Sequence, residues 1–343
     1  MYQFEEKIEQ LRLAHNIAGM AVAVTDKEKV IYAKGFGVDS VERPQLPADP
    51  ISMYRIASVT KMFVAATTMR LVEQGILDLD APVRTYVPWL TFSRPEATER
   101  MTLRHLLSHT GGLPKAFTPN GPKDECFLEV AMREELPHVP MAHVPGDGAY
   151  EYANWGTRVA SFIDQTVMGK PFSQVAKEQL LEPLGMDRTT FHLREVATYP
   201  VSVPHEVAED GSLRVIHSMS ENGASFASGG LYSNVYDLCK FARMLMNGGR
   251  NDAGGQVLQE KTLQQMFTPH ADRAEPGDRY GLNIHIHKFG NRDLYGHLGC
   301  VPPYATSVFT DPISGYGVVT LMNTKHTELR IPVPELVLSE LIG

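Results

Sequence analysis

The sequence predicts an α+β fold in which an antiparallel β-sheet is flanked by N- and C-terminal helices and joined to a mostly helical second domain. Strand-like segments lie near both ends of the chain, within residues 19–35 and 281–322, and helical patterns with many prolines and loops fill residues 76–224. The length of 343 residues amounts to about two domains. We therefore expect a discontinuous sheet domain from residues 1–75 and 225–343, and a mostly helical domain from residues 76–224.

The first 75 residues predict the order helix, strand, strand, helix. Residues 4–17 space their apolar side chains as a surface helix does. Residues 19–25 and 30–35 are typical of two β-strands that a charged turn joins. Residues 58–75 carry the apolar pattern of a mostly buried helix, which Gly75 would end.

The middle and the end of the chain differ in their patterns. Helices are expected near residues 102–109, 156–168 and 172–182. Four strands and a last helix are then expected in the C-terminal part, at residues 281–287, 294–297, 305–309, 317–322 and 328–341. Because strand patterns occupy both ends, we expect one antiparallel sheet built from both termini, with the helical part inserted between them.

Charge and cysteine content exclude several classes of protein. The formal net charge of −8 leaves no basic surface for a phosphate backbone, so we expect no nucleic-acid partner. No apolar run approaches the ~18 residues of a membrane span, and the acidic start differs from a signal peptide. Cys126, Cys239 and Cys300 form no paired framework, which suits a reducing compartment. We expect a cytoplasmic protein with no membrane partner, unless an export leader has been removed.

Several familiar catalytic and cofactor motifs do not occur in the sequence. It contains no G-x-S-x-G, no G-x-x-x-x-G-K-[ST], no G-x-G-x-x-G and no H-E-x-x-H. His285 and His287 share one face of an expected strand, but no carboxylate or cysteine accompanies them at a useful spacing. We expect ordinary strand histidines there, with no metal site and no cofactor.

Ser58 and Lys61 form the single S-x-x-K sequence in the chain. Residues three apart on a helix lie on the same face, so the two side chains come within reach of each other. The helix dipole favours an alkoxide at a helix N-terminus, and a buried lysine with a lowered pKa can remove the serine proton. On this pair alone, a helix-capping serine beside an unrelated lysine is an equal alternative.

Two further motifs follow the S-x-x-K pair in sequence order. Tyr152 and Asn154 form a Y-x-N motif, and His297 and Gly299 form an H-x-G motif. The order S-x-x-K, Y-x-N, H-x-G resembles that of the penicillin-recognising serine hydrolases. Four segments are similar to the class C β-lactamase family, at residues 54–63, 101–113, 227–233 and 317–323. The resemblance therefore covers essentially the whole chain.

The resemblance implies a role for each motif residue and a place for the site. Ser58 would attack a carbonyl carbon and form an acyl-enzyme that water then cleaves. Lys61 and Tyr152 would share the proton transfers, and Asn154 would orient Lys61 and the substrate. The backbone N–H groups of Ser58 and Cys300 would form the oxyanion hole. The family fold places the site in the cleft between the sheet domain and the helical domain.

Two positions depart from the family pattern and bear on the substrate. His297 stands where most β-lactamases carry lysine, and a mostly neutral histidine grips a substrate carboxylate more weakly. Pro303 stands where relatives usually have glycine, and it cannot donate a hydrogen bond from the strand edge that a peptide would follow. We therefore expect a serine hydrolase of small esters or amides, D-amino acid derivatives among them, with a small molecule as its partner.

Several alternatives stay open from the sequence. The other functions are a β-lactamase or D-Ala-D-Ala carboxypeptidase, an acyltransferase, and a non-catalytic binding module with the same cleft. Tyr232 begins a second Y-x-N motif, although its setting resembles a structural segment of the family. His105 and His109 are further catalytic candidates. Cys300 is a candidate nucleophile with His297, although side chains three apart on a strand face opposite ways. The oligomeric state is not predicted.

Overall fold

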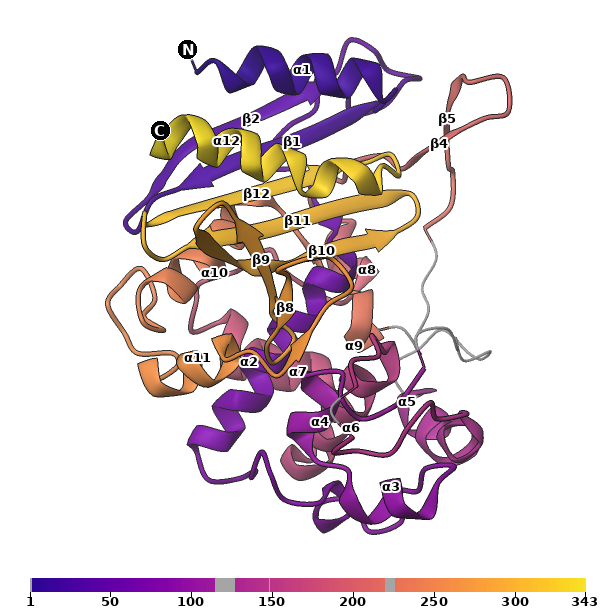
Figure 1. Ribbon diagram of the computed structural model, residues 1–343. Helices are drawn as coiled ribbons and strands as arrows, with labels where there is room; N and C mark the ends of the chain where they lie inside the picture. Colours follow the sequence, from indigo (N-terminus) through magenta and orange to yellow (C-terminus); the bar gives the residue numbers. More distant parts are fainter. Residues whose placement is uncertain (1, 115–126, 148, 220–225) are drawn as a thin grey trace.

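The protein is built around an eight-stranded antiparallel β-sheet (Figure 1). The computed structural model describes residues 2–114, 127–147, 149–219 and 226–343. The strand order across the sheet is β2-β1-β12-β11-β10-β9-β8-β7, so that β1 and β12, from the two ends of the chain, are neighbours. Strand β1 pairs antiparallel with β12, with Met20 opposite Met322 and Val24 opposite Val318.

The strands differ greatly in length, and the longest is β10. The members of the large sheet are β1 (Gly19–Thr25), β2 (Val30–Gly37), β7 (Ala271–Asp272), β8 (Arg279–Tyr280), β9 (His285–Phe289), β10 (Arg292–Val301), β11 (Tyr304–Asp311) and β12 (Tyr316–Met322). Two short pairs lie outside it, namely β3 (Tyr54–Arg55) with β6 (Tyr232–Ser233), and β4 (His205–Val207) with β5 (Leu213–Val215).

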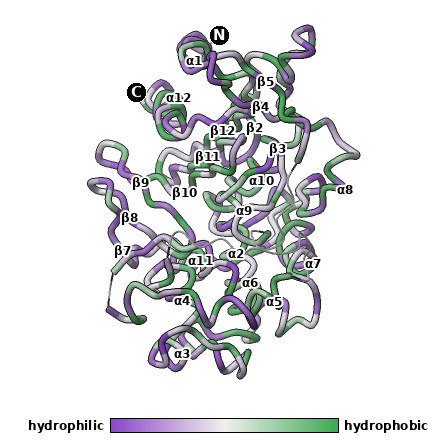
Figure 2. Tube along the Cα trace, turned by 90° about the vertical axis from the view of Figure 1, so that its right-hand side faces the viewer, coloured by the Kyte–Doolittle hydropathy of each residue, from purple (hydrophilic) through white to green (hydrophobic). Residues whose placement is uncertain are grey.

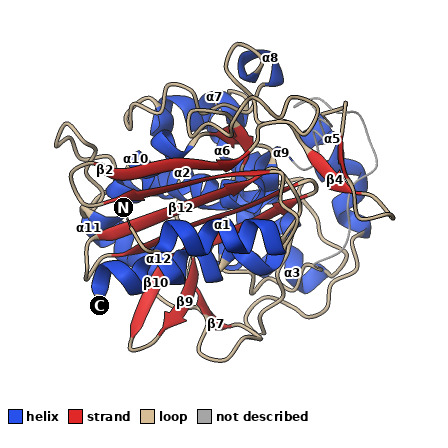
Figure 3. Ribbon diagram, turned by 90° about the horizontal axis from the view of Figure 1, so that it is seen from above, coloured by secondary structure: helices blue, strands red, loops and turns tan. Residues whose placement is uncertain are grey.

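Helices cover both faces of the large sheet (Figure 3). Helices α1 (Phe4–Ala14) and α12 (Pro332–Ile342) lie side by side on one face, and α2 (Thr60–Glu73) and α10 (Val235–Met246) lie on the other. Alternate side chains of β1 divide between the two layers because successive strand residues point to opposite faces. Met20, Val22 and Val24 pack with α1 and α12, whereas Ala21 and Ala23 pack with α2 and α10.

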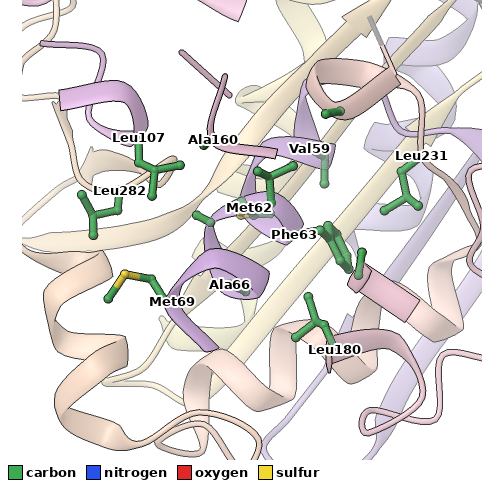
Figure 4. Close-up of a cluster of buried hydrophobic side chains, with 14 of the residues drawn as sticks. Val59, Met62, Phe63, Ala66, Met69, Leu107, Ala160, Leu180, Leu231 and Leu282 are labelled. Carbon is green, nitrogen blue, oxygen red and sulfur yellow. The ribbon is translucent and has the colours of Figure 1, made fainter. Parts of the chain in front are cut away.

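The helical part packs around α2, which is buried along almost its whole length. It packs against α6 (Asn154–Met168), α7 (Phe172–Ala176), α9 (Phe226–Gly229) and α11 (Glu260–Phe267). The other helices of the described residues are α3 (Pro95–Arg100), α4 (Leu103–Leu107), α5 (Phe127–Val130) and α8 (Leu193–Val196). Figure 4 shows the α2 side chains of Met62, Phe63, Ala66 and Met69, which lie amid apolar residues of several other segments. Helix α2 therefore carries a rigid N-terminus, because its packing leaves it little freedom to move.

Hydropathy follows this arrangement along the chain. In Figure 2 the inner strands and helices are largely hydrophobic, whereas β8 and the turns beside it are largely hydrophilic. No helix of the described residues is long and apolar enough to cross a membrane. The cytoplasmic location and the division into two domains stay predictions.

The α+β fold class expected from the sequence is confirmed. Two expected elements differ in detail. The strand expected at 281–287 begins only at His285, because Asn283 has a positive φ of 51° and the chain turns there. The helix expected at 172–182 is a short α-helix continued by a π-turn at Lys177–Leu181. Helices α10 and α11 were not anticipated by the sequence analysis.

Candidate active site

Ser58 lies in a tight turn that joins strand β3 to helix α2. The turn is a single 3₁₀ unit, Ala57–Val59, and α2 begins directly after it at Thr60. Ala57 has a positive φ of 51°, an unfavourable conformation for alanine that persists only where the surroundings impose it. The surroundings here include the Thr306 hydroxyl, which donates a 2.8 Å hydrogen bond to the carbonyl of Ile56. The turn leaves Ser58 partly exposed beside a buried helix.

Lys61 is completely buried one helical turn after Ser58. Its Nζ lies 3.0 Å from Ser58 Oγ and donates a 2.8 Å hydrogen bond to the carbonyl oxygen of Ser228. Burial, and secondarily the positive charge of Arg158, hold the pKa of Lys61 well below its usual value. A lysine with a lowered pKa is a neutral amine for a larger fraction of molecules, and a neutral amine can accept a proton.

Tyr152 is a second hydrogen-bond partner of Ser58 besides Lys61. Its hydroxyl makes a hydrogen bond with Ser58, and burial raises its pKa to about 12. The Nζ atom of Lys61 lies 5.0 Å from the centre of the Tyr152 ring. The structure thus brings together the serine, the lysine and the tyrosine of the first two sequence motifs.

The contact expected between Asn154 and Lys61 is not seen among the described residues, and the role of Asn154 toward a substrate stays a prediction. Asn154 is the first residue of α6, and among the described residues its side chain makes no hydrogen bond to Lys61. The Ser228 carbonyl orients Lys61 instead. Motif spacing could not predict this backbone acceptor from α9, because any residue type can supply a carbonyl.

Strand β10 approaches the Ser58 turn along an open edge. Strand β9 pairs only with the Arg292–Gly296 half of β10, so the half from His297 to Val301 has β11 on one side and the Ser58 turn on the other. Gly299 permits this approach, because a Cβ there would lie 2.4 Å from the carbonyl oxygen of Ile56. The predicted site residues Gly299 and Cys300 therefore border the Ser58 turn.

The expectation for Pro303 was wrong about its place. Pro302 and Pro303 form the turn between β10 and β11, beyond the last strand residue, Val301. They line a separate small pocket with Tyr232. Pro303 therefore removes no hydrogen-bond donor from the open edge of β10.

His297 is buried, and hydrogen bonds hold both of its ring nitrogens. Nδ1 lies 2.6 Å from the carbonyl oxygen of Leu298, and Nε2 lies 2.8 Å from the hydroxyl of Tyr280. Burial, and then the charge of Lys61, hold the pKa of His297 well below its usual range. His297 is therefore a neutral ring with no free donor, and a carboxylate cannot replace its partners without breaking a hydrogen bond.

The other catalytic candidates from the sequence lie in surroundings that favour structural roles. Asn234, of the second Y-x-N motif, accepts hydrogen bonds from two backbone N–H groups and caps α10. His105 pairs with the Thr102 hydroxyl, which caps α4. Burial raises the pKa of the Cys300 thiol, which disfavours a thiolate nucleophile. Cys239 is buried and free, and Cys126 lies outside the described residues.

A cavity of about 450 Å³ opens at Ser58. Sequence reasoning missed three residues that line it together with Tyr152 and His297, namely Tyr150, Arg273 and Arg330. Arg273 Nη1 lies 3.3 Å from the Tyr150 hydroxyl, and Arg330 donates to the carbonyl of Gly299. Glu275 also lines the cavity, and its carboxylate lies 3.3 Å from Arg273 Nη2, so it offsets the charge of one of the two arginines. No sequence signal marked these arginines, because each lies outside the three motifs.

The strand histidines differ from expectation, because a carboxylate does accompany them. Asp278 Oδ2 lies 2.5 Å from His285 Nε2, and Asp278 Oδ1 lies 2.9 Å from His287 Nδ1. The second nitrogen of His287 lies 2.9 Å from Glu335 of α12. This cluster has the donors for a divalent cation, but hydrogen bonds to Asp278 already occupy His285 Nε2 and His287 Nδ1. A second, more exposed group consists of His15, His326 and Glu328.

Comparisons with known proteins identify relatives of this chain. The family model described as Beta-lactamase matches residues 4–341. Protein flp of Staphylococcus aureus (strain MW2) is 25% identical over 316 residues, which are 90% of this chain and 60% of that protein. The chain therefore spans three fifths of the length of that relative.

Solved structures share the fold. A penicillin-binding protein homologue from Pyrococcus abyssi, which is octameric, superposes with a TM-score of 0.86 at 27% identity, over 99% of this chain and 76% of that one. The D-amino acid amidase from Ochrobactrum anthropi SV3, in complex with D-phenylalanine, gives a TM-score of 0.81 over 98% of this chain and 97% of that one. At 22% identity, the second likeness shows the fold alone.

Proposed function

Because this chain belongs to the Beta-lactamase family, we propose that it is a serine hydrolase that cleaves small esters or amides through an acyl-enzyme on Ser58. One observation carries the proposal. A buried lysine with a lowered pKa lies 3.0 Å from a partly exposed serine hydroxyl, which opens onto a cavity large enough for a small substrate. The amidase of similar fold supports D-amino acid derivatives as members of the substrate class.

Burial assigns different parts to Lys61 and Tyr152 in acylation. Burial disfavours the charged form of each group, so the lysine tends toward a neutral amine and the tyrosine remains a neutral phenol. Lys61 therefore accepts the proton of Ser58 as Oγ bonds to the substrate carbonyl carbon. Tyr152 gives its proton to the departing alcohol or amine as the carbon–heteroatom bond breaks, and it recovers a proton from the lysine ammonium.

The oxyanion of the tetrahedral intermediate requires hydrogen-bond donors beside Ser58. The N–H groups of Ser58 and Cys300 are the proposed donors, since the open edge of β10 borders the Ser58 turn. Each such donor is worth about 3 kcal/mol in related chemistry. In deacylation a water molecule attacks the acyl carbon, gives a proton to the same lysine–tyrosine pair, and Ser58 Oγ regains its proton.

A second candidate function is supported by the charge of the cavity. Arg330 lines it beside the ion pair of Arg273 with Glu275, so a β-lactam or a peptide ending in D-Ala-D-Ala has a positive group for its carboxylate. Neutral His297 disfavours the same substrates, because it cannot form the charged contact that a lysine would form. The small ester or amide stays our first proposal.

The test combines active-site labelling with a turnover screen. We expect a fluorophosphonate probe to label Ser58, as located by mass spectrometry, and Ser58→Ala to lose both labelling and turnover while remaining folded. The screen compares p-nitrophenyl esters, D-amino acid p-nitroanilides and nitrocefin on one preparation. An adduct on Cys300 would overturn the mechanism. Absence of labelling and of turnover in the unmodified protein would favour the non-catalytic binding module.

A further inference from the structure

His109 holds the backbone on both sides of Tyr152. Its carbonyl oxygen accepts a 2.9 Å hydrogen bond from the N–H of Glu151, and its ring Nδ1 accepts a 3.3 Å hydrogen bond from the N–H of Ala153. His109 itself has a positive φ of 60°, which turns both acceptors toward the same segment. The His109 and Tyr152 rings are also in contact, with centres 4.6 Å apart.

The same ring begins a hydrogen-bond chain that ends on strand β10. His109 Nε2 lies 3.2 Å from the Tyr280 hydroxyl, which lies 2.8 Å from His297 Nε2. All three side chains are at least 97% buried. These hydrogen bonds therefore join the loop that carries Tyr152 to the strand that carries Gly299 and Cys300.

The hydrogen-bond partners at the two ends fix the direction in which protons are donated along this hydrogen-bond chain. His109 Nδ1 must be the acceptor because the Ala153 N–H can only donate, so His109 carries its proton on Nε2 and donates it to Tyr280. His297 Nδ1 must carry a proton because the Leu298 carbonyl can only accept. His297 Nε2 is then an acceptor for the Tyr280 hydroxyl proton. Two neutral histidines of opposite tautomer thus satisfy every bond.

We propose that His109 and Tyr280 are positioning residues that fix Tyr152 and the β10 edge around Ser58, through a directed chain of hydrogen bonds. The proposal rests on the proposed function, in which Tyr152 passes a proton at Ser58. The tyrosine hydroxyl must stay within hydrogen-bond reach of the serine, and a displacement of 1 Å costs about 100-fold in rate. Neither residue needs to exchange a proton with the substrate.

Substitutions at residue 109 separate positioning from simple packing. Asparagine tolerates a positive φ, and its side-chain oxygen can take the place of Nδ1 as acceptor for the Ala153 N–H. His109→Asn should therefore retain the rate of Ser58 labelling by a fluorophosphonate within about tenfold, whereas His109→Ala should lose about 100-fold. His105→Ala is the matched control, since His105 lies in the same segment and faces Thr102. It should leave the labelling rate unchanged.

Tautomer signals by NMR test the chain without any enzymatic turnover. Nitrogen-15 spectra of histidine-labelled protein should show His297 protonated on Nδ1 and His109 protonated on Nε2, each assigned from its own glutamine variant. Tyr280→Phe, which keeps the ring and removes the hydroxyl, should shift both sets of ring nitrogens. It should also lower kcat with less effect on KM.

The outcomes separate this proposal from the proposed function. If unmodified protein does not label at Ser58, the proposed function fails, and the tautomers still report on the chain. If it labels and His109→Ala labels as fast as His105→Ala, the positioning role is refuted. If His109 and His297 both carry their proton on the same ring nitrogen, the directed hydrogen-bond chain is refuted. This test does not depend on whether the alanine variant folds.

Discussion

Replacing Gly299 by alanine should damage catalysis far more than stability. The added Cβ would lie 2.4 Å from the carbonyl oxygen of Ile56 and 2.1 Å from Thr306 Oγ1. The buried Thr306 hydroxyl can move only by losing its hydrogen bond to Ile56, and the Ile56 oxygen belongs to the backbone that carries the Ser58 turn. Strand β10 and that turn must therefore separate.

The size of the separation follows from ordinary contact distances. The contact with Ile56 is about 1 Å shorter than the 3.4 Å at which ordinary contact begins. A shift of this size at the proposed oxyanion hole, between the N–H groups of Ser58 and Cys300, should lower kcat by about 100-fold. Overpacking of this kind costs about 1–3 kcal/mol of unfolding free energy, so the protein should still fold.

The assay measures kcat for a short-chain p-nitrophenyl ester and, separately, the midpoint temperature of thermal unfolding. Gly229→Ala is the matched control, because a Cβ there lies near the same turn at ordinary distances, 3.5 Å from Val301 and 3.6 Å from Ala57. We expect the control to keep its activity. A Gly299→Ala variant with kcat within about threefold of the parent would show that close approach of β10 is not required for the reaction.

Four further predictions concern proton transfer, substrate and pH. Tyr152→Phe should lower kcat at least ~100-fold, whereas Tyr232→Phe should change it little, and the reverse order in steady-state kinetics would reassign the Y-x-N motif. Lys61→Met should abolish turnover yet raise the thermal midpoint, more at pH 6 than at pH 9. The reason is that a lysine with a lowered folded pKa binds fewer protons folded than unfolded, and this cost grows as pH falls below its unfolded pKa. A short-chain p-nitrophenyl ester should have a higher kcat/KM than nitrocefin, because neutral His297 has no free donor for a carboxylate; the opposite ranking would favour the β-lactamase alternative. Burial alone would raise the pKa of Asp278, but its hydrogen bonds from His285 and the Lys288 N–H outweigh burial and lower it to about 2. The parent should therefore lose on the order of 2 kcal/mol as pH falls from 4 to 2, and denaturant titrations of Asp278→Asn should lack this loss.

Local patterns determined much of the fold and part of the candidate site. The strand-like run at residues 19–25 is a local property of the sequence, so it predicted β1 without knowledge of its neighbours. The Ser58–Lys61 spacing spans a single helical turn, and the two atoms do lie 3.0 Å apart. The resemblance to a family then connected these residues to Tyr152 and to the strand at His297.

Contacts between distant segments decided the rest. Even the carboxylate beside His285, from Asp278 only seven residues earlier, reaches it through a turn whose path no spacing rule predicts. Arg273 reaches the cavity from the segment around β7 and β8, at the far edge of the sheet order. The hydrogen bond between His109 and Tyr280 joins residues 171 positions apart.

The physical reason is the range over which each interaction acts along the chain. Helical and strand periodicity relate residues within a few positions, so the sequence by itself determined the main elements and the serine–lysine pair. The pKa of Lys61 and the neutral state of His297 depend on burial, which arises only when several distant segments pack together. The tertiary structure therefore decided the protonation of the site, the partner that orients Lys61, and the place of Pro303 beyond the strand.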